Sequence, residues 1–392
     1  MGTSIVENLD ILNEILLRLP VKSLMRFKCV SKQWLAHITS PCFCKSHTLC
    51  LYQTPHPFPS ALLVNPFGPK YPPCLIMPST SCDTVPFTPM VTNFHFLNVP
   101  SITLRQSCNG LLLIKGHIPN LYFVCNPITE QFVALTLPSP KDPTHDAFYL
   151  HLAFNPLRSP HYKVILIRFN DSKHYEFDIN IYSSKTRCWS DFGVCLREKV
   201  WQLTNDSVVY CNGVIYWHSY FDKSLCFDVE NQCFKTFPMP HDIDSFYIRY
   251  FGECGGHLHI ILSPNTLTPM NFDILELKED CSGWSLRFHV NLWELVEGYY
   301  GPTYMFAPFN VICVFRQEKE ENSVLVFLLG CEVICYNLSD YTLTRLTAFY
   351  PLFVPSKNKH FVFDTIEFNS APNFRVFQYF ENLSWDGDSS TL

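Results

Sequence analysis

Residues 11–34 read ILNEILLRLPVKSLMRFKCVSKQW. Their apolar side chains recur at the spacing of one broad helical face, which predicts an amphipathic helix carrying Ile11, Leu12, Ile15, Leu16 and Leu19. Pro20 should end this helix, because proline lacks the backbone N–H and disfavours helical angles at the residue before it. A second helix is predicted after Pro20, and Ser31 is suited to cap a third helix that carries Trp34.

Three such helices form a segment too small to be stable alone, because chains of about 40 residues rarely bury enough surface. Their excess apolar surface must therefore be covered either by the rest of the chain or by another protein. The residues themselves leave both possibilities open: a helical cap on the following domain, or a docking element.

The string NEILLRLPVKSLMRFKCVSKQW resembles the F-box of plant F-box proteins almost position by position, within residues 7–47. The resemblance implies that these helices dock on the Skp adaptor of a cullin-RING ubiquitin ligase. One departure is that Glu7 and Asn8 stand where the family often has Leu-Pro. The residues expected to form the docking surface or to support it from within are Leu12, Leu16, Leu19, Pro20, Leu24, Phe27, Val30 and Trp34.

Composition limits the classes of protein open to the chain. Of its 392 residues 47% are hydrophobic, 15% aromatic and 16% charged, which is typical of a globular protein and excludes disorder for most of the length. A formal net charge of −6 gives no general attraction to phosphate backbones, so nucleic-acid binding is not expected. The first 50 residues are basic, which suits an acidic partner and equally fits a solvated helix face.

The expected compartment is the cytoplasm, the nucleus or both, without a membrane span. No segment resembles a signal peptide, and no run of 18 apolar residues occurs. Cysteines such as Cys125 and Cys313 lie singly in apolar segments, so reduced, buried thiols are expected. Asn337-Leu338-Ser339 and Asn382-Leu383-Ser384 match the glycosylation pattern, which a cytosolic chain leaves unused.

From about residue 100 the sequence repeats a unit of short β runs and polar turns. The turns VCNPITEQF, IYSSKTRCW, CFDVENQCF, ILELKEDCSGW and CYNLSDYTL each lead into an apolar residue that starts a strand, at intervals of 45 to 59 residues. Cys108-Asn109-Gly110 and Cys211-Asn212-Gly213 also precede apolar strands, and Asn-Gly is hairpin chemistry. Units of this length with about four strands predict a β-propeller of five or six blades.

These segments resemble the F-box associated, kelch-like interaction domain found after plant F-boxes, in SCNGLLLI, YFVCNPITEQFVALTLP, CNGVIYW and QYFENLSW. The resemblance implies that this domain recruits a protein destined for ubiquitination. The predicted fold class is therefore multidomain α plus all-β, a three-helix F-box followed by a propeller. Its parts are an F-box at 1–47, a Pro-rich linker with possible edge strands at 48–99, the propeller at 100–385 and a frayed tail at 386–392. An alternating strand near residues 374–380 is expected to pair with one from the 49–64 region.

The sequence contains no convincing catalytic or cofactor motif. C-x-x-C pairs, G-x-G-x-x-G, the P-loop and G-x-S-x-G do not occur. The nearest approach to a metal set is Cys254, His257 and His259, whose two histidines would share one face of a strand. Gly255 and Gly256 mark a turn there, so structural histidines are the favoured interpretation. We predict no cofactor, no metal and no enzymatic activity.

Aromatic residues where strands give way to loops are better candidates for binding a target, because interfaces are enriched in such anchors. Two clusters meet this description, and they are made of Trp217, His218, Tyr220 and Phe221, and of Trp293, Tyr299 and Tyr300.

The sequence is thus interpreted as a non-catalytic substrate-recognition subunit of an SCF-type (Skp-cullin-F-box) ubiquitin ligase. Its partners would be the Skp adaptor, the cullin and RING subunits reached through it, and a target protein that the sequence does not identify. Two rival interpretations remain open at this stage. One is a propeller enzyme or glycan-binding lectin capped by the helices, and the other is a scaffold that binds no adaptor.

Overall fold

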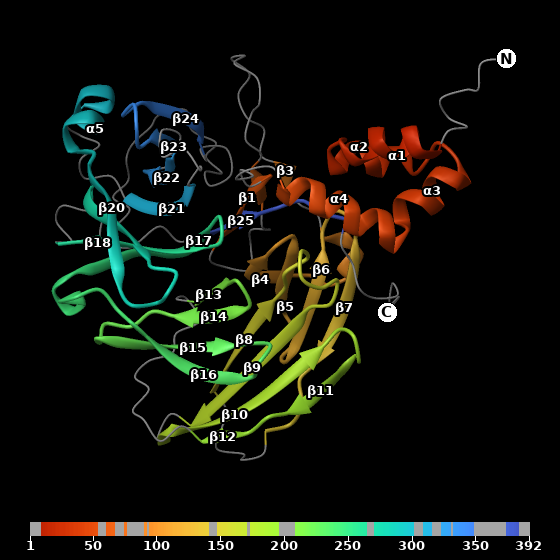
Figure 1. The fold of residues 1–392 in the computed structure, drawn as a ribbon, viewed down its shortest axis with the longest axis horizontal. Coiled ribbons are helices and arrows are strands. Elements are labelled where there is room, and N and C mark those ends of the chain that lie inside the picture. Colours follow the sequence, from red (N-terminus) through yellow and green to blue (C-terminus); the bar gives the residue numbers. More distant parts are fainter. Residues whose placement is uncertain are drawn as a thin grey trace. The chain divides into compact units, whose positions relative to one another are not determined.

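The computed structural model describes residues 9–53, 60–66, 74–76, 90–91, 94–140, 147–170, 173–195, 208–264, 270–301, 309–315, 323–330, 332–348 and 374–383. Helices come first, and antiparallel strands dominate the later described segments (Figure 1). The predicted tail at 386–392 lies outside the described residues. Within the described ranges, no helix is both long and apolar enough to cross a membrane.

The N-terminal helices are α1 (Leu9–Leu17), α2 (Val21–Phe27), α3 (Lys32–Thr39) and α4 (Pro41–Gln53). The first three were predicted, and Ser31 caps α3 as expected, since its Oγ accepts the Trp34 N–H at 3.1 Å. The fourth helix was not predicted. Ser40 caps it by accepting the Phe43 N–H at 3.2 Å, and Pro41 suits its first position because a proline there loses no helical hydrogen bond.

These four helices share a small hydrophobic core. The buried members from the helices are Leu12, Leu16, Val21, Leu24, Ile38 and Phe43. The core also contains Leu383, and Ile128 packs against it, although neither belongs to the helices. His47 connects α4 to the turn after α1, because its Nε2 lies 2.8 Å from the carbonyl oxygen of Leu19. The helices are therefore stabilised partly by distant segments of the chain.

Five sheets of antiparallel strands follow one another along the chain. The first contains β4 (Ile102–Cys108), β5 (Leu111–Gly116), β6 (Leu121–Asn126) and β7 (Gln131–Thr136). The second contains β8 (Ala147–Ala153), β9 (Lys163–Asn170), β10 (Lys173–Ser183), β11 (Cys188–Asp191) and β12 (Val194–Cys195). The third contains β13 (Val208–Cys211), β14 (Val214–Trp217), β15 (Lys223–Asp228) and β16 (Cys233–Pro238). The fourth contains β17 (Tyr247–Cys254), β18 (His257–Ser263), β19 (Asn271–Leu277) and β20 (Trp284–Asn291), and the fifth β21 (Phe309–Phe315), β22 (Val324–Leu329), β23 (Glu332–Asn337) and β24 (Leu343–Ala348).

A further sheet joins segments from both ends of the sequence, in the order β25 (Phe374–Tyr379), β1 (Ala61–Pro66), β2 (Cys74–Ile76) and β3 (Met90–Val91). The predicted pairing of a strand near residues 374–380 with one from the 49–64 region is confirmed, because β25 is the neighbour of β1. The described residues therefore form six sheets, which agrees with the five or six units predicted from the repeats.

The five repeated turns have one structural role, which is to join the third and fourth strands of a sheet. Each contains a residue other than glycine with a positive φ, at Glu130, Arg187, Gln232, Cys281 or Tyr341. A single left-handed residue lets a short polar loop reverse the chain between twisted strands. The repeat predicted from sequence is thus a repeat of hairpins.

The two Cys-Asn-Gly turns join the first and second strands of their sheets. Both central residues have positive φ, with 44° and 89° at Asn109 and Gly110, as a type I′ hairpin requires. The asparagine also reaches the next sheet along the chain: Asn109 Nδ2 donates to the Phe154 carbonyl and Asn212 Nδ2 to the Gly256 carbonyl, each at 2.7 Å. This motif therefore builds contacts between successive sheets.

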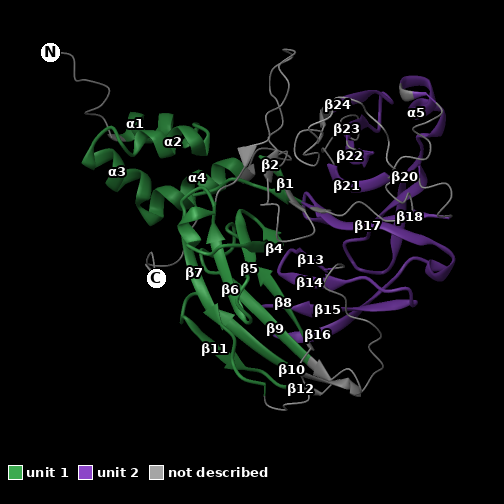
Figure 2. Ribbon diagram, turned by 180° about the vertical axis from the view of Figure 1, so that it is seen from behind, with its two compact units in different colours: residues 1–74, 91–199, 377–392 green, residues 75–90, 200–376 purple. Residues whose placement is uncertain are grey.

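The chain divides into two compact units, which Figure 2 colours separately. Unit 1 comprises residues 1–74, 91–199 and 377–392 and holds the four helices with sheets β4–β7 and β8–β12. Unit 2 comprises residues 75–90 and 200–376, with sheets β13–β16, β17–β20 and β21–β24. The largest core among the described residues of unit 2 is aromatic and aliphatic, and includes Phe272, Phe309, Phe327, Ile334 and Val296.

Tryptophan side chains link neighbouring sheets in both units. Trp189 Nε1 donates to the Thr136 carbonyl at 3.0 Å in unit 1, and Trp284 Nε1 donates to the Pro238 carbonyl at 2.8 Å in unit 2. Each tryptophan lies near the start of a fourth strand, and its acceptor lies at the end of the fourth strand of the preceding sheet. These aromatic residues have the packing role that the repeat predicts.

Candidate functional site

The N-terminal helices keep some apolar side chains inside and present others to solvent. Among the predicted docking residues, Leu12, Leu16 and Leu24 are buried in the helical core. Leu19, Phe27 and Trp34 are half-buried and pack against that core, with the rings of Phe27 and Trp34 edge to face at 5.5 Å. Pro20 and Val30 are exposed. Most of the predicted set therefore supports the helices from within.

Four large apolar side chains of these helices are strongly exposed, and we call them the N-terminal apolar surface: Ile11 (46%), Ile15 (46%), Val30 (59%) and Leu35 (44%). Ile11 and Ile15 are one helical turn apart on α1 and so lie on the same face. Sequence reasoning placed them in the amphipathic pattern but not among the docking candidates, because their stripe adjoins that of Leu12 and Leu16. Only the packing of the helices shows that Leu12 and Leu16 are buried while Ile11 and Ile15 are exposed.

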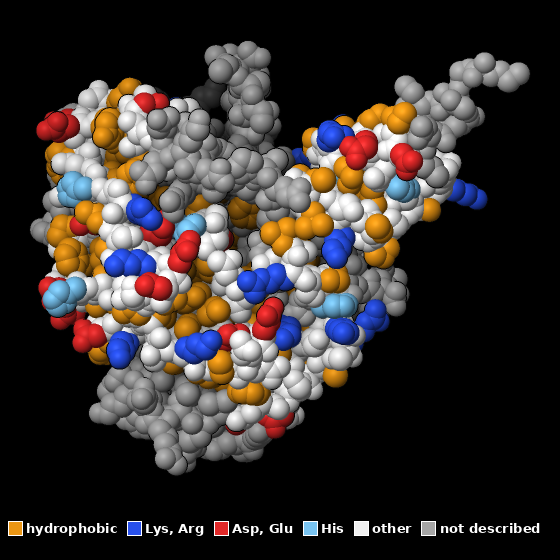
Figure 3. All heavy atoms as spheres, in the orientation of Figure 1, with side chains coloured by type: hydrophobic (Ala, Val, Ile, Leu, Met, Phe, Trp, Pro, Cys, Tyr) orange, Lys and Arg blue, Asp and Glu red, His pale blue; other side chains and the backbone are white. Residues whose placement is uncertain are grey.

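Charged side chains surround this surface. Lys22, Arg26 and Lys32 are exposed, and so are Asp10 and Glu14 beside Ile11 and Ile15. Figure 3 shows blue and red side chains among the orange ones over the helices. Arg18 pairs with Glu14 at 2.7 Å, with both side chains more than half exposed, so this pair contributes little to stability. The apolar surface is therefore flanked by charges of both signs.

A second exposed surface lies in unit 2, where the loop after β14 meets the start of β17. Tyr220, Phe221 and Tyr247 are each 45–48% exposed, and we call these three residues the aromatic surface. His218 lies beneath them, with its ring centroid 5.3 Å from that of Phe251 and 6.3 Å from that of Tyr220. Burial lowers the pKa of His218 to about 4, so its imidazole is neutral at physiological pH.

Of the first predicted aromatic cluster, Tyr220 and Phe221 thus reach the surface. Trp217 is only 1% exposed and belongs to the interior. Tyr247 was not predicted, because it lies on a different strand 27 residues after Tyr220. The guanidinium of Arg249 lies 5.9 Å from the centre of the Tyr247 ring, close enough for a cation–π contact.

The second predicted aromatic cluster needs a correction. Its residues were expected in a loop, but they form the helix α5 (Trp293–Tyr300). Asn291 Oδ1 accepts the Trp293 N–H at 3.1 Å at the start, and Gly301 ends the helix with a φ of 81°. Trp293 packs against the largest core of unit 2, Tyr299 is 68% exposed, and the side chain of Tyr300 lies outside the described residues.

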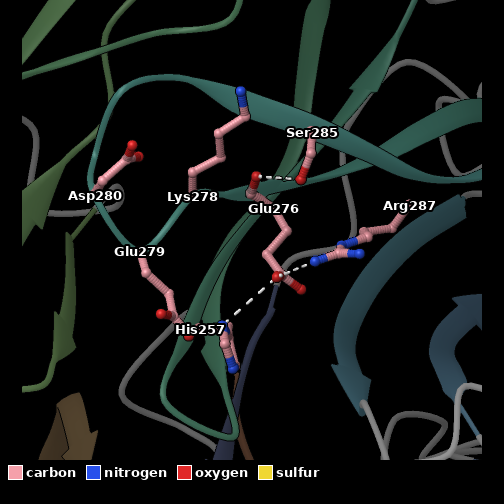
Figure 4. Close-up of a pocket in the computed structure, with 7 residues that line it drawn as sticks. All are labelled: His257, Glu276, Lys278, Glu279, Asp280, Ser285 and Arg287. Carbon is pink, nitrogen blue, oxygen red and sulfur yellow. Dashed lines mark hydrogen bonds and ion pairs between the residues drawn. The ribbon is translucent and has the colours of Figure 1, made fainter.

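An open pocket of about 480 Å³ lies on the fourth sheet, with a buried carboxylate at its base (Figure 4). Glu276 is 3% exposed and accepts a hydrogen bond from Arg287 at 2.8 Å. His259 Nε2 lies 3.2 Å from the same carboxylate and His257 Nδ1 lies 3.5 Å from it. The predicted common face of the two histidines is confirmed, and their neighbours are a glutamate and an arginine. Among the described residues, no group of three or more His, Cys, Asp or Glu is arranged to hold a metal ion.

Comparison with known proteins accounts for both parts of this arrangement. The F-box domain family matches residues 8–46, which contain the N-terminal apolar surface. The F-box associated beta propeller domain family matches residues 77–298, more than half of the chain. The chain belongs to the plant F-box proteins that carry this propeller domain. Helices α1–α4 are its F-box, and the predicted fold class, F-box helices followed by a β-propeller, is confirmed.

Its relatives include F-box protein At5g07610 of Arabidopsis thaliana, 28% identical over 90% of this chain and 88% of the relative. The putative F-box/kelch-repeat protein At1g12870 of the same plant is 25% identical to this chain. The aligned region covers 62% of this chain and 61% of that relative. Among solved structures, the one titled "YCF48 bound to D1 peptide" aligns with 74% of this chain. The alignment covers 82% of the chain in that structure, at 10% sequence identity and a TM-score of 0.36. That likeness is too remote to support any conclusion. F-box domains generally bind Skp adaptors in SCF complexes, and proteins of this family are adaptors rather than enzymes.

Proposed function

We propose that this protein is the substrate-recognition subunit of an SCF-type ubiquitin ligase. Its F-box docks on the Skp adaptor, which joins it to the cullin and RING subunits, and its propeller holds a target protein for ubiquitination. The protein contributes proximity, which converts transfer of ubiquitin between separate molecules into a reaction within one assembly. This role belongs to the cytoplasm or the nucleus.

The observation that carries the proposal is the N-terminal apolar surface. The helices already have a buried core, supplemented by Leu383, yet Ile11, Ile15, Val30 and Leu35 remain in water. An exposed apolar side chain contributes roughly 1.5–3 kcal/mol when a partner buries it fully. Exposed apolar side chains that gather in one patch mark interaction sites, and Ile11 and Ile15 share one face of α1.

The aromatic surface supports the second half of the proposal, the capture of a target. Tyrosine and arginine are enriched among the residues that dominate binding energies at protein interfaces, and phenylalanine is enriched in interfaces generally. Tyr220, Phe221 and Tyr247 come from two neighbouring sheets of unit 2, and Arg249 adds a guanidinium beside them. We therefore assign this surface to the target protein.

The adaptor interface can be tested with one exposed residue. Ile15→Asp places a charge in the N-terminal apolar surface and should weaken binding of the purified Skp adaptor by about 10- to 100-fold, since 1.4 kcal/mol corresponds to tenfold in affinity. Ile118→Asp is the matched control, because Ile118 is 50% exposed in a propeller hairpin and should leave binding unchanged. Titration calorimetry with the full-length protein would measure both dissociation constants.

Equal affinities for the two variants would contradict the docking assignment. Deleting the helices would be a less specific test, because it would expose Leu383, which is 3% exposed in the intact protein. Substituting Leu24 has the same weakness, since this side chain is fully buried in the helical core. Ile15 avoids both problems because it is already in contact with water.

A further inference from the structure

The segment after β25 returns to the F-box and completes it. Leu383 is 3% exposed and belongs to the same hydrophobic cluster as Leu12, Leu16 and Leu24. The residue is thus as deeply buried as the F-box's own core leucines, although it lies at the opposite end of the sequence. Ile128, in the β6–β7 hairpin, packs against the same cluster. Three distant parts of the chain therefore meet in one core.

Asn382 anchors this segment to the first propeller sheet. The residue is fully buried, and its Nδ2 donates to the Asn109 carbonyl in the β4–β5 turn at 2.5 Å. Its own carbonyl accepts a hydrogen bond from Asn126 Nδ2 at 3.1 Å. Asn126 is also fully buried, and its Oδ1 accepts the Ile128 N–H at 3.0 Å. The asparagine is therefore held by both hairpins of the sheet.

Glu381 connects the segment to the residue that precedes β1. Its N–H donates to Ser60 Oγ at 2.9 Å, in the residues that lead from α4 into β1. Burial raises the pKa of its carboxyl group, and the nearby Lys22 of α2 opposes that rise. Consecutive residues 381, 382 and 383 thus contact the start of β1, the first sheet and the F-box core.

We infer that residues 381–383 are positioning residues, which fix the F-box against sheet β4–β7 within unit 1 and so define how an adaptor bound to the F-box is held relative to this part of the propeller. The inference rests on the proposed function for its biological meaning, but not for its structural content. A receptor that brings two proteins together transfers ubiquitin efficiently only if the angle and distance between its two binding surfaces are defined. With a flexible joint between F-box and propeller, this angle and this distance would vary from molecule to molecule.

The chain supplies a matched control, because the tripeptide Asn-Leu-Ser occurs again at 337–339 in unit 2. Leu338 is 5% exposed and lies in the largest core of that unit, and Asn337 Oδ1 accepts the Ser339 N–H at 2.9 Å. The double variant Asn337→Ala/Leu338→Ala removes one asparagine and one leucine side chain, as Asn382→Ala/Leu383→Ala does. Both double variants should lower stability, but only the second removes the contact with the F-box.

The test uses the full-length protein without partners, by hydrogen–deuterium exchange and small-angle X-ray scattering. In Asn382→Ala/Leu383→Ala, exchange of amides in residues 9–53 should rise at least tenfold over the control variant, and the maximum particle dimension should increase. The single variant Leu383→Met should give exchange rates and a maximum dimension close to those of the unsubstituted protein, because methionine fills a volume similar to that of leucine.

Either of two results would overturn the inference. Equal exchange in residues 9–53 for the two double variants would show that the segment does not support the F-box. Raised exchange with an unchanged scattering profile would show a local packing role without control of position. Both readouts are independent of the adaptor, so failure of the Ile15→Asp experiment would refute the docking proposal and leave this inference intact.

Discussion

Gly110→Ala is expected to destabilise the protein by about 2–5 kcal/mol, because two separate costs coincide at this turn. Gly110 has a φ of 89°, a region where an L side chain costs about 1–2 kcal/mol. A Cβ built there would overlap Asn382 Nδ2 and lie 2.7 Å from the Phe380 carbonyl oxygen. The backbone cannot yield easily, so the segment 380–383 must move and lose the buried hydrogen bonds of Asn382.

Gly256→Ala is the control for backbone strain alone. Its φ of 82° is similar, but a Cβ there would meet only Asn212 at 3.5 Å, an ordinary van der Waals distance. Chemical denaturation followed by circular dichroism would compare the two variants. We expect Gly110→Ala to lose about 1–3 kcal/mol more than Gly256→Ala, the cost of leaving buried polar groups unsatisfied. Equal losses would show that the segment 380–383 does not press against the β4–β5 turn.

Glu276→Ala is expected to lower the free energy of unfolding by about 2–4 kcal/mol, because it removes a buried carboxylate that several groups share. The side chain of Glu276 is 4% exposed and contacts Arg287 and His259. Arg287 is 33% exposed, so water can partly solvate its guanidinium in the variant. That solvation keeps the loss below the value for a fully buried ion pair.

Two further variants identify the source of this effect. Glu279→Ala lies on the same hairpin and is exposed, so its change in unfolding free energy should stay within about 0.5 kcal/mol. Glu276→Gln keeps an acceptor oxygen but loses the charge, and should fall between the other two. Thermal unfolding monitored by tryptophan fluorescence would rank the three. A Glu276→Ala protein as stable as Glu279→Ala would show that the buried network contributes nothing.

The regular part of the fold was predictable from sequence because its signals are local. Asn-Gly dipeptides and polar turns every 45 to 59 residues report the hairpins directly, since they reflect backbone angles within a few residues. The helix after Ser40 was missed although its capping serine and following proline are visible, because α4 has no clear apolar stripe. Trp293 and Tyr299 were misplaced in a loop because Gly298 lies within the short helix α5 and Gly301 ends it, and both glycines resemble loop signals.

The binding surfaces were less predictable from sequence, because tertiary packing decides which of two neighbouring apolar positions on a helix is buried and which is exposed. Leu12 and Leu16 lie beside Ile11 and Ile15 in the same pattern, yet only the first two are inside. Tyr247 joins Tyr220 and Phe221 through the packing of two neighbouring sheets, which no local pattern reports. The role of Asn382-Leu383 was hidden for the same reason, because its sequence matches a glycosylation signal while its structure buries the asparagine completely.

The burial of Leu383 in the core shared by α1–α4 also means that this core is completed late during synthesis. Ribosomes extend a chain by about 5–20 residues per second, so Leu383 emerges at least about 20 seconds after Leu12. Until then the nascent F-box lacks one of its core side chains, and the β4–β5 turn lacks Asn382. A chain whose translation stops before residue 383 would carry F-box helices with an incomplete hydrophobic core.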